Sequence, residues 1–393
     1  MNTVYPSIMK FSFQTPKWML FGSGAAENVG LEAKQFNVKK GLILTDENIE
    51  KTGLVDKVRK SLEVEGLEIN IFNKVEPEPR LEMAESTANA ARESKYEFVV
   101  GIGGGSVLDM AKLASIAITN PGDISRYVGG AKIQKPGVPK ILLPTTAGTG
   151  SEVSRYAVVS LSAEELKTSV VDPKLLADVA IVDPTATVTM PPKTTAGSGM
   201  DALSHAVEAM MSLESSPLTD AVALEAIERI AKNLRAAYFQ RENLEARYNM
   251  SLAAMMAGLA LENAGTCGGH AASNAYGTKY RIPHGVACGI ALPYLMEYNL
   301  PKCEQKLASI ASAMGEKTDK LSRRETAYQA VVAVQRLIKD IDVPSNLKGL
   351  GIPREAIPRI AEKMLKGHRM LVRQPRKLTK DDAIKLMDKM YGE

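Results

Sequence analysis

The chain has 393 residues, of which 45% are hydrophobic and 24% are charged, and its formal net charge is +4. This composition is typical of a globular protein of two or three domains and excludes a largely disordered or collagen-like chain. The small net charge gives no reason to expect nucleic acid or a membrane surface as a partner.

The first half of the chain alternates between short apolar runs and helical patterns. The apolar runs are expected to be strands, at 41–45, 67–72, 98–102, 140–143 and 179–182. Apolar residues at helical spacing lie between them, at 49–64, 80–94 and 106–118. Buried strands that alternate with helices indicate a mainly parallel sheet with helices on both faces.

The pattern changes after Pro191-Pro192, a pair that favours a domain boundary. Beyond it few strands are expected, and helical patterns follow at 199–212, 218–236, 242–262, 303–315, 323–340, 354–365 and 380–391. The most apolar helical stretch, Met250 to Leu261, is about a dozen residues long, which is too short to cross a membrane. We therefore expect an α/β domain over 1–190 and an all-α domain over 191–393.

Cysteine usage and the N-terminal segment bear on the compartment. The three cysteines, Cys267, Cys288 and Cys303, are odd in number and too few for a disulfide framework, which favours a reducing compartment. The segment MNTVYPSIMKFSFQTPKW has no apolar core followed by a small-residue cleavage site, so no signal peptide is expected. Together these features predict a cytoplasmic protein.

A glycine-rich segment, GIGGGS over 101–106, stands where the third expected strand passes into a helix. Glycines there allow backbone N–H groups to approach a phosphate, and the helix N-terminus adds positive potential. The alternative is a tight turn in which Ser106 and Asp109 have the spacing of a capping box. The earlier Gly22-Ser23-Gly24 is expected to be a turn only, because no strand or helix is predicted around it.

Two further polar features follow expected strands. Asp46 closes the first strand, where a carboxylate can accept hydrogen bonds from a ribose 2′-hydroxyl and repel a 2′-phosphate. A turn aspartate or helix N-cap is the simpler interpretation of Asp46. The segment PTTAGTGSE over 144–152 follows the fourth strand and can line a phosphate, a ribose or a nicotinamide, or form an ordinary polar loop.

Three of the four histidines fall in two segments of the helical half. Asp201 and His205 are four residues apart in SGMDALSHAVEAMM, so a helix places both on one face. His270 and His284 lie in GGHAASNAYGTKYRIPHG. A single such histidine is ordinarily a core or capping residue. One carboxylate with three imidazoles, however, suits a divalent ion such as Fe²⁺ or Zn²⁺ and leaves room for a substrate oxygen.

Five segments in this order resemble the iron-containing (group III) alcohol dehydrogenase family: GGGSVLDMAK, PTTAGTGSEV, AGSGMDALSHAVE, GGHAASNAYG and IPHGVACGIALP. The resemblance runs from Phe21 to Tyr391. It implies a Rossmann-like, NAD-binding α/β domain with a mainly parallel sheet, followed by an all-α metal-binding and catalytic domain. This is a dehydroquinate-synthase-like two-domain architecture. The resemblance also implies a homodimer or larger homo-oligomer.

The resemblance further implies site residues and cofactors. The family's metal is held by one Asp and three His, which map onto Asp201, His205, His270 and His284. Cofactor contacts carry over to Asp46, Gly103, Gly104, Gly105, Ser106, Asp109, Thr145, Thr146, Thr149, Ser151 and Lys167. The implied cofactors are NAD(H) and Fe²⁺, with Zn²⁺ as an alternative metal. Asn274 is a departure, because many family members have a histidine there and an amide cannot take a proton at neutral pH.

The implied function is reversible, metal-assisted hydride transfer between NAD(H) and a small primary alcohol or its aldehyde, in a cleft between the two domains. The alternative is a glycerol dehydrogenase-like or another diol or hydroxy-acid dehydrogenase of the same superfamily. A dehydroquinate-synthase-like lyase and a non-catalytic NAD- or metal-binding homologue are less favoured, because all four ligands and both loops are present. The expected partner is a small molecule, with neither nucleic acid nor membrane.

Overall fold

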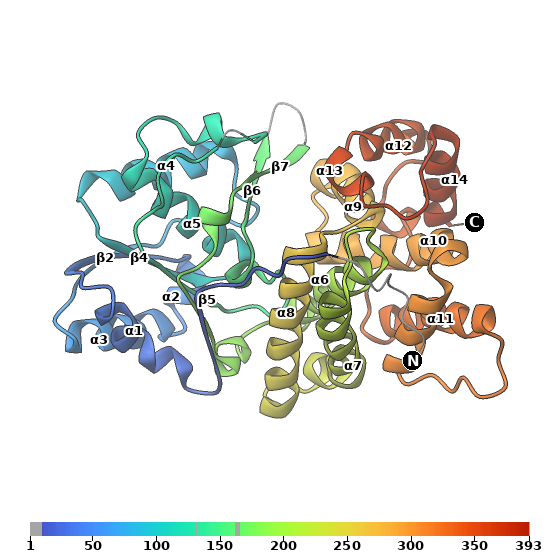
Figure 1. Cartoon of the computed structure of the whole chain (residues 1–393), viewed down its shortest axis with the longest axis horizontal. Helices are drawn as coiled ribbons and strands as arrows, with labels where there is room; N and C mark the ends of the chain where they lie inside the picture. Colours follow the sequence, from blue (N-terminus) through green and yellow to red (C-terminus); the bar gives the residue numbers. More distant parts are fainter. Residues whose placement is uncertain (1–9, 131, 162–165, 393) are drawn as a thin grey trace. The chain divides into compact units, whose positions relative to one another are not determined.

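The computed structural model describes residues 10–130, 132–161 and 166–392. Two compact units make up the chain (Figure 1). One unit is Thr15–Met190, and the other runs from Pro191 onward and includes the segment that ends at Gln14. The first unit is α/β and the second is helical, which confirms the predicted fold class.

A six-stranded sheet forms the centre of the α/β unit, and every neighbouring pair of strands is parallel. Its strands are β1 (Trp18–Phe21), β2 (Lys40–Leu44), β3 (Glu68–Phe72), β4 (Phe98–Gly103), β5 (Lys140–Pro144) and β8 (Val179–Val182). Their spatial order is β1-β8-β5-β4-β2-β3. Strands β2, β4, β5 and β8 are buried along almost their whole length, which explains why they are continuous apolar runs in the sequence.

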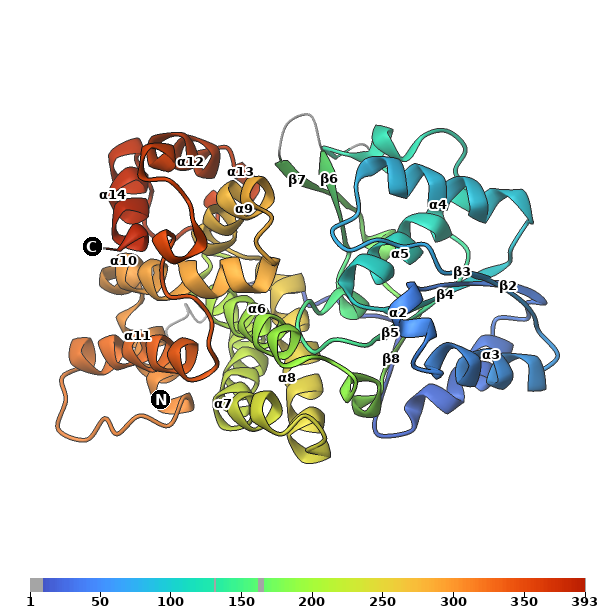
Figure 2. The same cartoon turned by 180° about the vertical axis from the view of Figure 1, so that it is seen from behind.

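Helices cover both faces of this sheet (Figures 1 and 2). On one face lie α1 (Val29–Lys34) and α3 (Leu54–Val64), whose apolar side chains form one buried cluster with the strands. On the other face lie α4 (Leu81–Glu93) and α5 (Gly105–Thr119). A single turn of helix, α2 (Glu47–Glu50), directly follows β2 and Asp46.

Three features of this unit differ from the expectation. A strand does precede Gly22-Ser23-Gly24, but β1 is a short edge strand with no buried residue and therefore lacks an apolar signature. The helix expected over 49–64 is broken at Gly53, whose φ of 81° is left-handed and is available to glycine at little cost. An antiparallel hairpin, β6 (Tyr156–Leu161) and β7 (Leu166–Val171), lies outside the main sheet.

The second unit has α-helices and no strand among its described residues. They are α6 (Pro192–Met211), α7 (Pro217–Phe239), α8 (Leu244–Ala264), α9 (Gly268–Tyr280), α10 (His284–Ala313), α11 (Arg323–Asp340), α12 (Ile357–Leu365), α13 (His368–Leu371) and α14 (Lys380–Tyr391). Capping boxes at Ser216, Ser322 and Thr379 fix where α7, α11 and α14 begin. No helix among the described residues is long and apolar enough to span a membrane.

Helix α9 and most of α10 are not predicted from the sequence. The three glycines of α9 lower its helical propensity, and Pro293 and Pro301 interrupt the pattern of α10. Helix α10 is in fact two helices joined by a kink, at which Cys303 has a non-helical φ of −126°. The expected helix over 303–315 is the second of these two.

Candidate active site

Helix α6 carries the first two candidate metal ligands near its middle. Asp201 and His205 are both buried and lie one turn apart, so their side chains share one side of the helix. The Nε2 atom of His205 is 3.6 Å from Oδ1 of Asp201. The two side chains are therefore neighbours in the structure, as their i, i+4 spacing in the sequence predicts.

The other two candidate ligands come from the beginnings of two further helices. His270 lies in the first turn of α9, and His284 is the first residue of α10. Their Nε2 atoms are 3.8 and 3.7 Å from the same Oδ1 of Asp201. Ligands about 2.1 Å from a tetrahedral ion lie about 3.4 Å from one another, so one divalent ion fits among these atoms.

Two glycines allow the helices that carry these histidines to approach α6. A Cβ atom at Gly285 would lie only 2.0 Å from the carbonyl oxygen of Gly197. A Cβ atom at Gly269 would lie 2.4 Å from Oε1 of Glu208. Each of these glycines is next to a histidine in the chain, so a side chain at either position would push that histidine away from Asp201.

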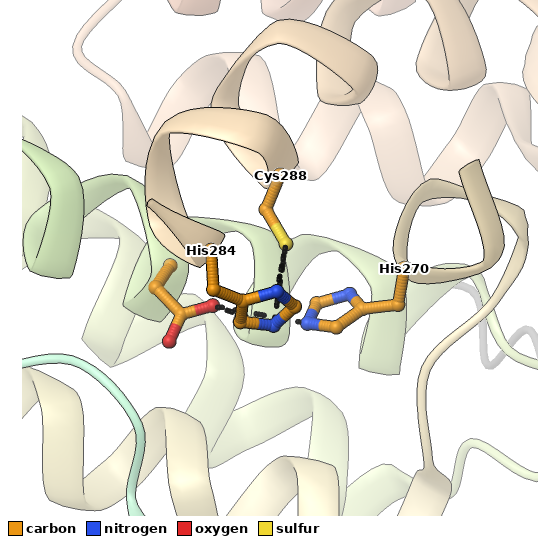
Figure 3. Close-up of side chains that lie close together, drawn as sticks. His270, His284 and Cys288 are labelled. Atoms are coloured by element: carbon orange, nitrogen blue, oxygen red, sulfur yellow. Dashed lines mark hydrogen bonds and ion pairs between the residues drawn. The ribbon is translucent and has the colours of Figure 1, made fainter. Parts of the chain in front are cut away.

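Cys288 is a further donor at this site that the sequence analysis does not single out. Its sulfur is 3.6 Å from Nε2 of His284, one turn earlier on α10, and 3.3 Å from Oγ of Ser273. Ligand atoms of Asp201, His270, His284 and Cys288 all lie within 4.8 Å of one another, and Figure 3 shows the three labelled side chains pointing toward one another. The i, i+4 spacing of His284 and Cys288 is the sequence signal that identifies this donor.

The surroundings of His270 favour positive charge at the site. Burial by itself opposes a charge on the ring, but Cys288 and the Glu208 carboxylate raise the pKa of His270 well above its usual value. Burial raises the pKa of the Cys288 thiol. A cation that binds at Nε2 of His270 has to displace this extra proton, and it then meets the same negative charge of Glu208.

In the α/β unit, the candidate nucleotide residues follow three adjacent strands. Asp46 follows β2, Gly104 follows β4 and Thr145 follows β5, and β4 lies between the other two. The strand order reverses between β2 and β4, because the chain passes outward from β2 to β3 and then returns on the other side. Open parallel sheets bind their ligands outside the carboxyl ends of the strands at such a switch point.

The loops after β4 and β5 lie against each other. A Cβ atom at Gly105 would be 2.7 Å from Cγ2 of Thr149, and one at Gly104 would be 3.5 Å from Cγ2 of Thr146. The amide of Thr145 donates to the carbonyl of Gly103 at 2.9 Å. The two loops therefore form one continuous surface at the edge of the sheet.

The capping box expected for Ser106 and Asp109 does not form, because α5 begins at Gly105 and Ser106 is already inside the helix. The Oγ atom of Ser106 instead accepts from the backbone N–H of Glu78 at 3.1 Å. Gly104 is the N-cap residue and no side chain caps the helix. No side chain at the N-cap therefore accepts from the backbone N–H groups of the first turn of α5. An anion site at a helix N-terminus requires such N–H groups to be available.

Asp109 and Ser151 belong to a buried network around Lys112. The Lys112 ammonium is 2.7 Å from Oγ of Ser151, 2.6 Å from the carbonyl of Tyr156 and 3.3 Å from Oδ1 of Asp109. Ser151 donates to Oδ1 of Asp109 at 2.5 Å, and the amide of Val158 donates to Oδ2 at 2.9 Å. These contacts tie α5 to the chain that follows β5, which suits a supporting role more than direct contact with a cofactor.

Asp46 and Lys167 each have a partner within the unit. Oδ1 of Asp46 accepts from the amides of Asn48 at 2.9 Å and Ile49 at 3.1 Å, so the residue is the N-cap of α2. Oδ2 accepts no hydrogen bond from the described part of the chain and remains available to a ribose hydroxyl. Lys167, on β7, forms an ion pair of 2.9 Å with Glu78.

Asn274 lies on α9, one turn after His270. Its Nδ2 is 3.9 Å from the sulfur of Met370, and its buried Oδ1 has no hydrogen-bond partner within the described ranges.

Both units match known protein families. The model described as "Iron-containing alcohol dehydrogenase" matches residues 16–184, and the one described as "Fe-containing alcohol dehydrogenase family, C-terminal" matches residues 195–391. The chain is 40% identical over 364 residues to long-chain-alcohol dehydrogenase 1 of Geobacillus thermodenitrificans, covering 92% of both chains. It is 37% identical over 351 residues to the NAD-dependent methanol dehydrogenase of Bacillus methanolicus, covering 89% of this chain and 92% of that one.

Among solved structures, that of a 1,3-propanediol oxidoreductase has a TM-score of 0.94 and 36% sequence identity to this chain. The match covers 98% of this chain and all of the other (100%). Both family models match this chain, and its relatives match it along almost their whole length. The chain belongs to the iron-containing alcohol dehydrogenase family.

Proposed function

We propose that this chain is an NAD-dependent, iron-containing alcohol dehydrogenase that transfers a hydride reversibly between NAD(H) and a small primary alcohol or its aldehyde. The observation that carries the proposal is the convergence of three histidine Nε2 atoms on Oδ1 of Asp201, at 3.6, 3.8 and 3.7 Å. Membership of the family supports the reaction class, and relatives named for a long-chain alcohol, methanol and 1,3-propanediol support an alcohol substrate.

We assign metal binding to four residues of the helical domain, Asp201, His205, His270 and His284. Three of them also lie near Cys288, so the fourth position has two candidates, His205 and Cys288. His205 is favoured because carboxylate and imidazole suit Fe²⁺, whereas soft thiolates select Zn²⁺ and Cu⁺. When bound, the ion supplies Lewis-acid chemistry that lowers the pKa of a hydroxyl beside it. Zn²⁺ is the alternative metal.

The residues around these ligands determine what else the site can do. The site lies among buried side chains, and three histidines add no charge to the single negative charge of Asp201 when they bind as neutral ligands. Asn274 can donate and accept hydrogen bonds but cannot take the proton of an alcohol at neutral pH. The proton therefore leaves through water or hydroxyl groups.

We assign NAD(H) to the switch point of the α/β domain. The backbone of the glycine loop and the first turn of α5 offer N–H donors to the pyrophosphate. The proposed contacts come from Asp46, Gly103, Gly104, Gly105, Ser106, Thr145, Thr146, Thr149 and Lys167. Asp109 and Ser151 support the loops through the Lys112 network.

Asp46→Asn is expected to weaken the preference for NAD(H) over NADP(H). The amide keeps the N-cap of α2, because Asn and Asp are equally good N-caps, but it removes the negative charge that repels a 2′-phosphate. We expect the ratio of kcat/KM for NADP⁺ to that for NAD⁺ to rise at least about tenfold, equivalent to ~1.4 kcal/mol. An unchanged ratio in a variant of normal thermal stability would remove Asp46 from the cofactor site.

Anaerobic purification with Fe²⁺ tests the proposed function. We expect one iron per chain and formation of NADH with short primary alcohols or diols, lost on chelation and restored by Fe²⁺. The best substrate of the panel separates a monoalcohol enzyme from a diol enzyme. Bound iron and NAD⁺ without net NADH formation would instead support a lyase or a non-catalytic homologue.

We also infer a cytoplasmic location and a homodimer or larger homo-oligomer. All three cysteines are free and buried, which supports a reducing compartment. The homo-oligomer rests on the resemblance to the iron-containing alcohol dehydrogenase family. Light scattering of the purified protein measures the assembly.

A further inference from the structure

Glu208 makes contacts from helix α6 to the beginning of helix α9. It lies one turn after His205 and is completely buried. Its Oε1 is 2.7 Å from Nδ1 of His270. Its Oε2 accepts from the backbone amides of Cys267 at 2.7 Å and His270 at 3.3 Å. One carboxylate oxygen thus faces the imidazole ring, and the other caps the first turn of α9.

The contact with Nδ1 determines where the imidazole carries its proton. In a neutral imidazole one nitrogen is a donor and the other is an acceptor, and a carboxylate can only accept. In the neutral ring that binds a metal, the hydrogen bond to Glu208 therefore places the proton on Nδ1 and leaves the lone pair on Nε2. Nε2 lies 3.8 Å from Oδ1 of Asp201 and has no hydrogen-bond partner in the part of the chain that the structure describes.

We propose that Glu208 is a positioning residue that holds His270 in the tautomer and orientation needed to bind the metal through Nε2, an inference that rests on the proposed metal site. Metal-binding histidines depend on such acceptors at their second nitrogen. The local sequence also makes room for this contact, since a Cβ atom at residue 269 would lie 2.4 Å from Oε1. A buried carboxylate is unfavourable unless it is paired, and its partners here are the ring of His270 and two backbone amides.

The competing explanation is that Glu208 only caps α9. The chain offers a matched control for that role, because Gln374 caps the same helix without touching a histidine. Its Oε1 accepts from the amide of Gly268 at 3.0 Å, and its Nε2 donates to Oδ1 of Asn299 at 2.6 Å. Loss of Gln374 therefore disturbs the beginning of α9 and leaves the Nδ1 contact intact.

Glu208→Gln tests the proposal with almost no change of shape. The amide has one acceptor oxygen and one NH₂ group, so it cannot accept from both Nδ1–H and the backbone amides. We expect Fe²⁺ affinity, measured anaerobically by competition with a chelator, to fall about 10- to 100-fold. Gln374→Ala is expected to lower the thermal midpoint of the metal-free protein while its Fe²⁺ affinity stays at the wild-type value. Wild-type affinity in Glu208→Gln, or equal losses in both variants, would overturn the proposal.

A spectrum of the wild-type protein decides the question even if Glu208→Gln does not fold. With only four histidines in the chain, ¹⁵N-histidine labelling of the Zn²⁺-loaded protein gives few signals to assign. We expect His270 to carry a protected proton on Nδ1, and a His270 with bare Nδ1 would contradict the proposal. If Glu208→Gln binds iron normally and the wild-type enzyme is metal-dependent, the positioning role of Glu208 is contradicted while the proposed function stands. A wild-type protein that binds no Fe²⁺ would overturn the proposed function itself.

Discussion

His284→Ala is expected to abolish metal-dependent turnover and to weaken Fe²⁺ binding by more than about 100-fold, since changes to mere supporting partners already cost 10- to 100-fold. The histidine is the first residue of α10, and its Nε2 is 3.7 Å from Oδ1 of Asp201. His284 is half-buried at the first position of the helix, so alanine there is expected to leave the fold intact while it removes one of the four proposed donors. Iron content after gel filtration and NADH formation with a primary alcohol measure the two effects.

The fourth histidine provides the control for this experiment. His368 is exposed on α13 and takes no part in the cluster around Asp201. His368→Ala is expected to keep wild-type iron content and turnover. Alcohol oxidation at the wild-type rate by metal-free His284→Ala protein would show that the reaction does not use this site.

Asp109→Ala is expected to destabilise the protein by about 3–5 kcal/mol, the cost of removing one partner of a buried ion pair. The ammonium of Lys112 is completely buried, and Asp109 is its carboxylate partner at 3.3 Å. For a unit of this size the thermal midpoint falls on the order of 10 °C. Ser151→Ala removes a neutral hydroxyl from the same network and is expected to cost less, about 1–3 kcal/mol.

The Asp109 variants also show whether Asp109 supports the loops or contacts the cofactor directly. Adding Lys112→Met to Asp109→Ala removes the uncompensated charge and is expected to restore part of the lost stability. At a temperature where Asp109→Ala is folded, its NAD⁺ affinity is expected to stay close to that of the wild type. Normal stability combined with a large loss of NAD⁺ affinity would instead make Asp109 a direct contact.

The sequence predicts best those parts of the molecule in which short-range pattern and three-dimensional position coincide. The buried strands β2, β4, β5 and β8 are continuous apolar runs because helices cover both faces of the sheet. The spacing of Asp201 and His205 predicts their contact because a helix turns once in about 3.6 residues.

Other parts depend on contacts between distant residues. The spacing of His205 and Glu208 places both on one side of α6, yet the ring that Glu208 touches belongs to His270, which is 62 positions later in the chain. The capping box expected at Ser106 fails because the helix begins one residue earlier, and Asp109 is drawn into the network around Lys112. Propensity alone does not identify such tertiary partners.

Iron-edge anomalous diffraction from crystals loaded anaerobically with Fe²⁺ tests the central claim most directly. We predict one iron peak per chain, bonded at about 2.0–2.2 Å to Asp201, His205, His270 and His284. A peak bonded to the sulfur of Cys288 with His205 uncoordinated would contradict the proposed donor set. A peak outside this cluster would contradict the assignment of the metal to the helical domain.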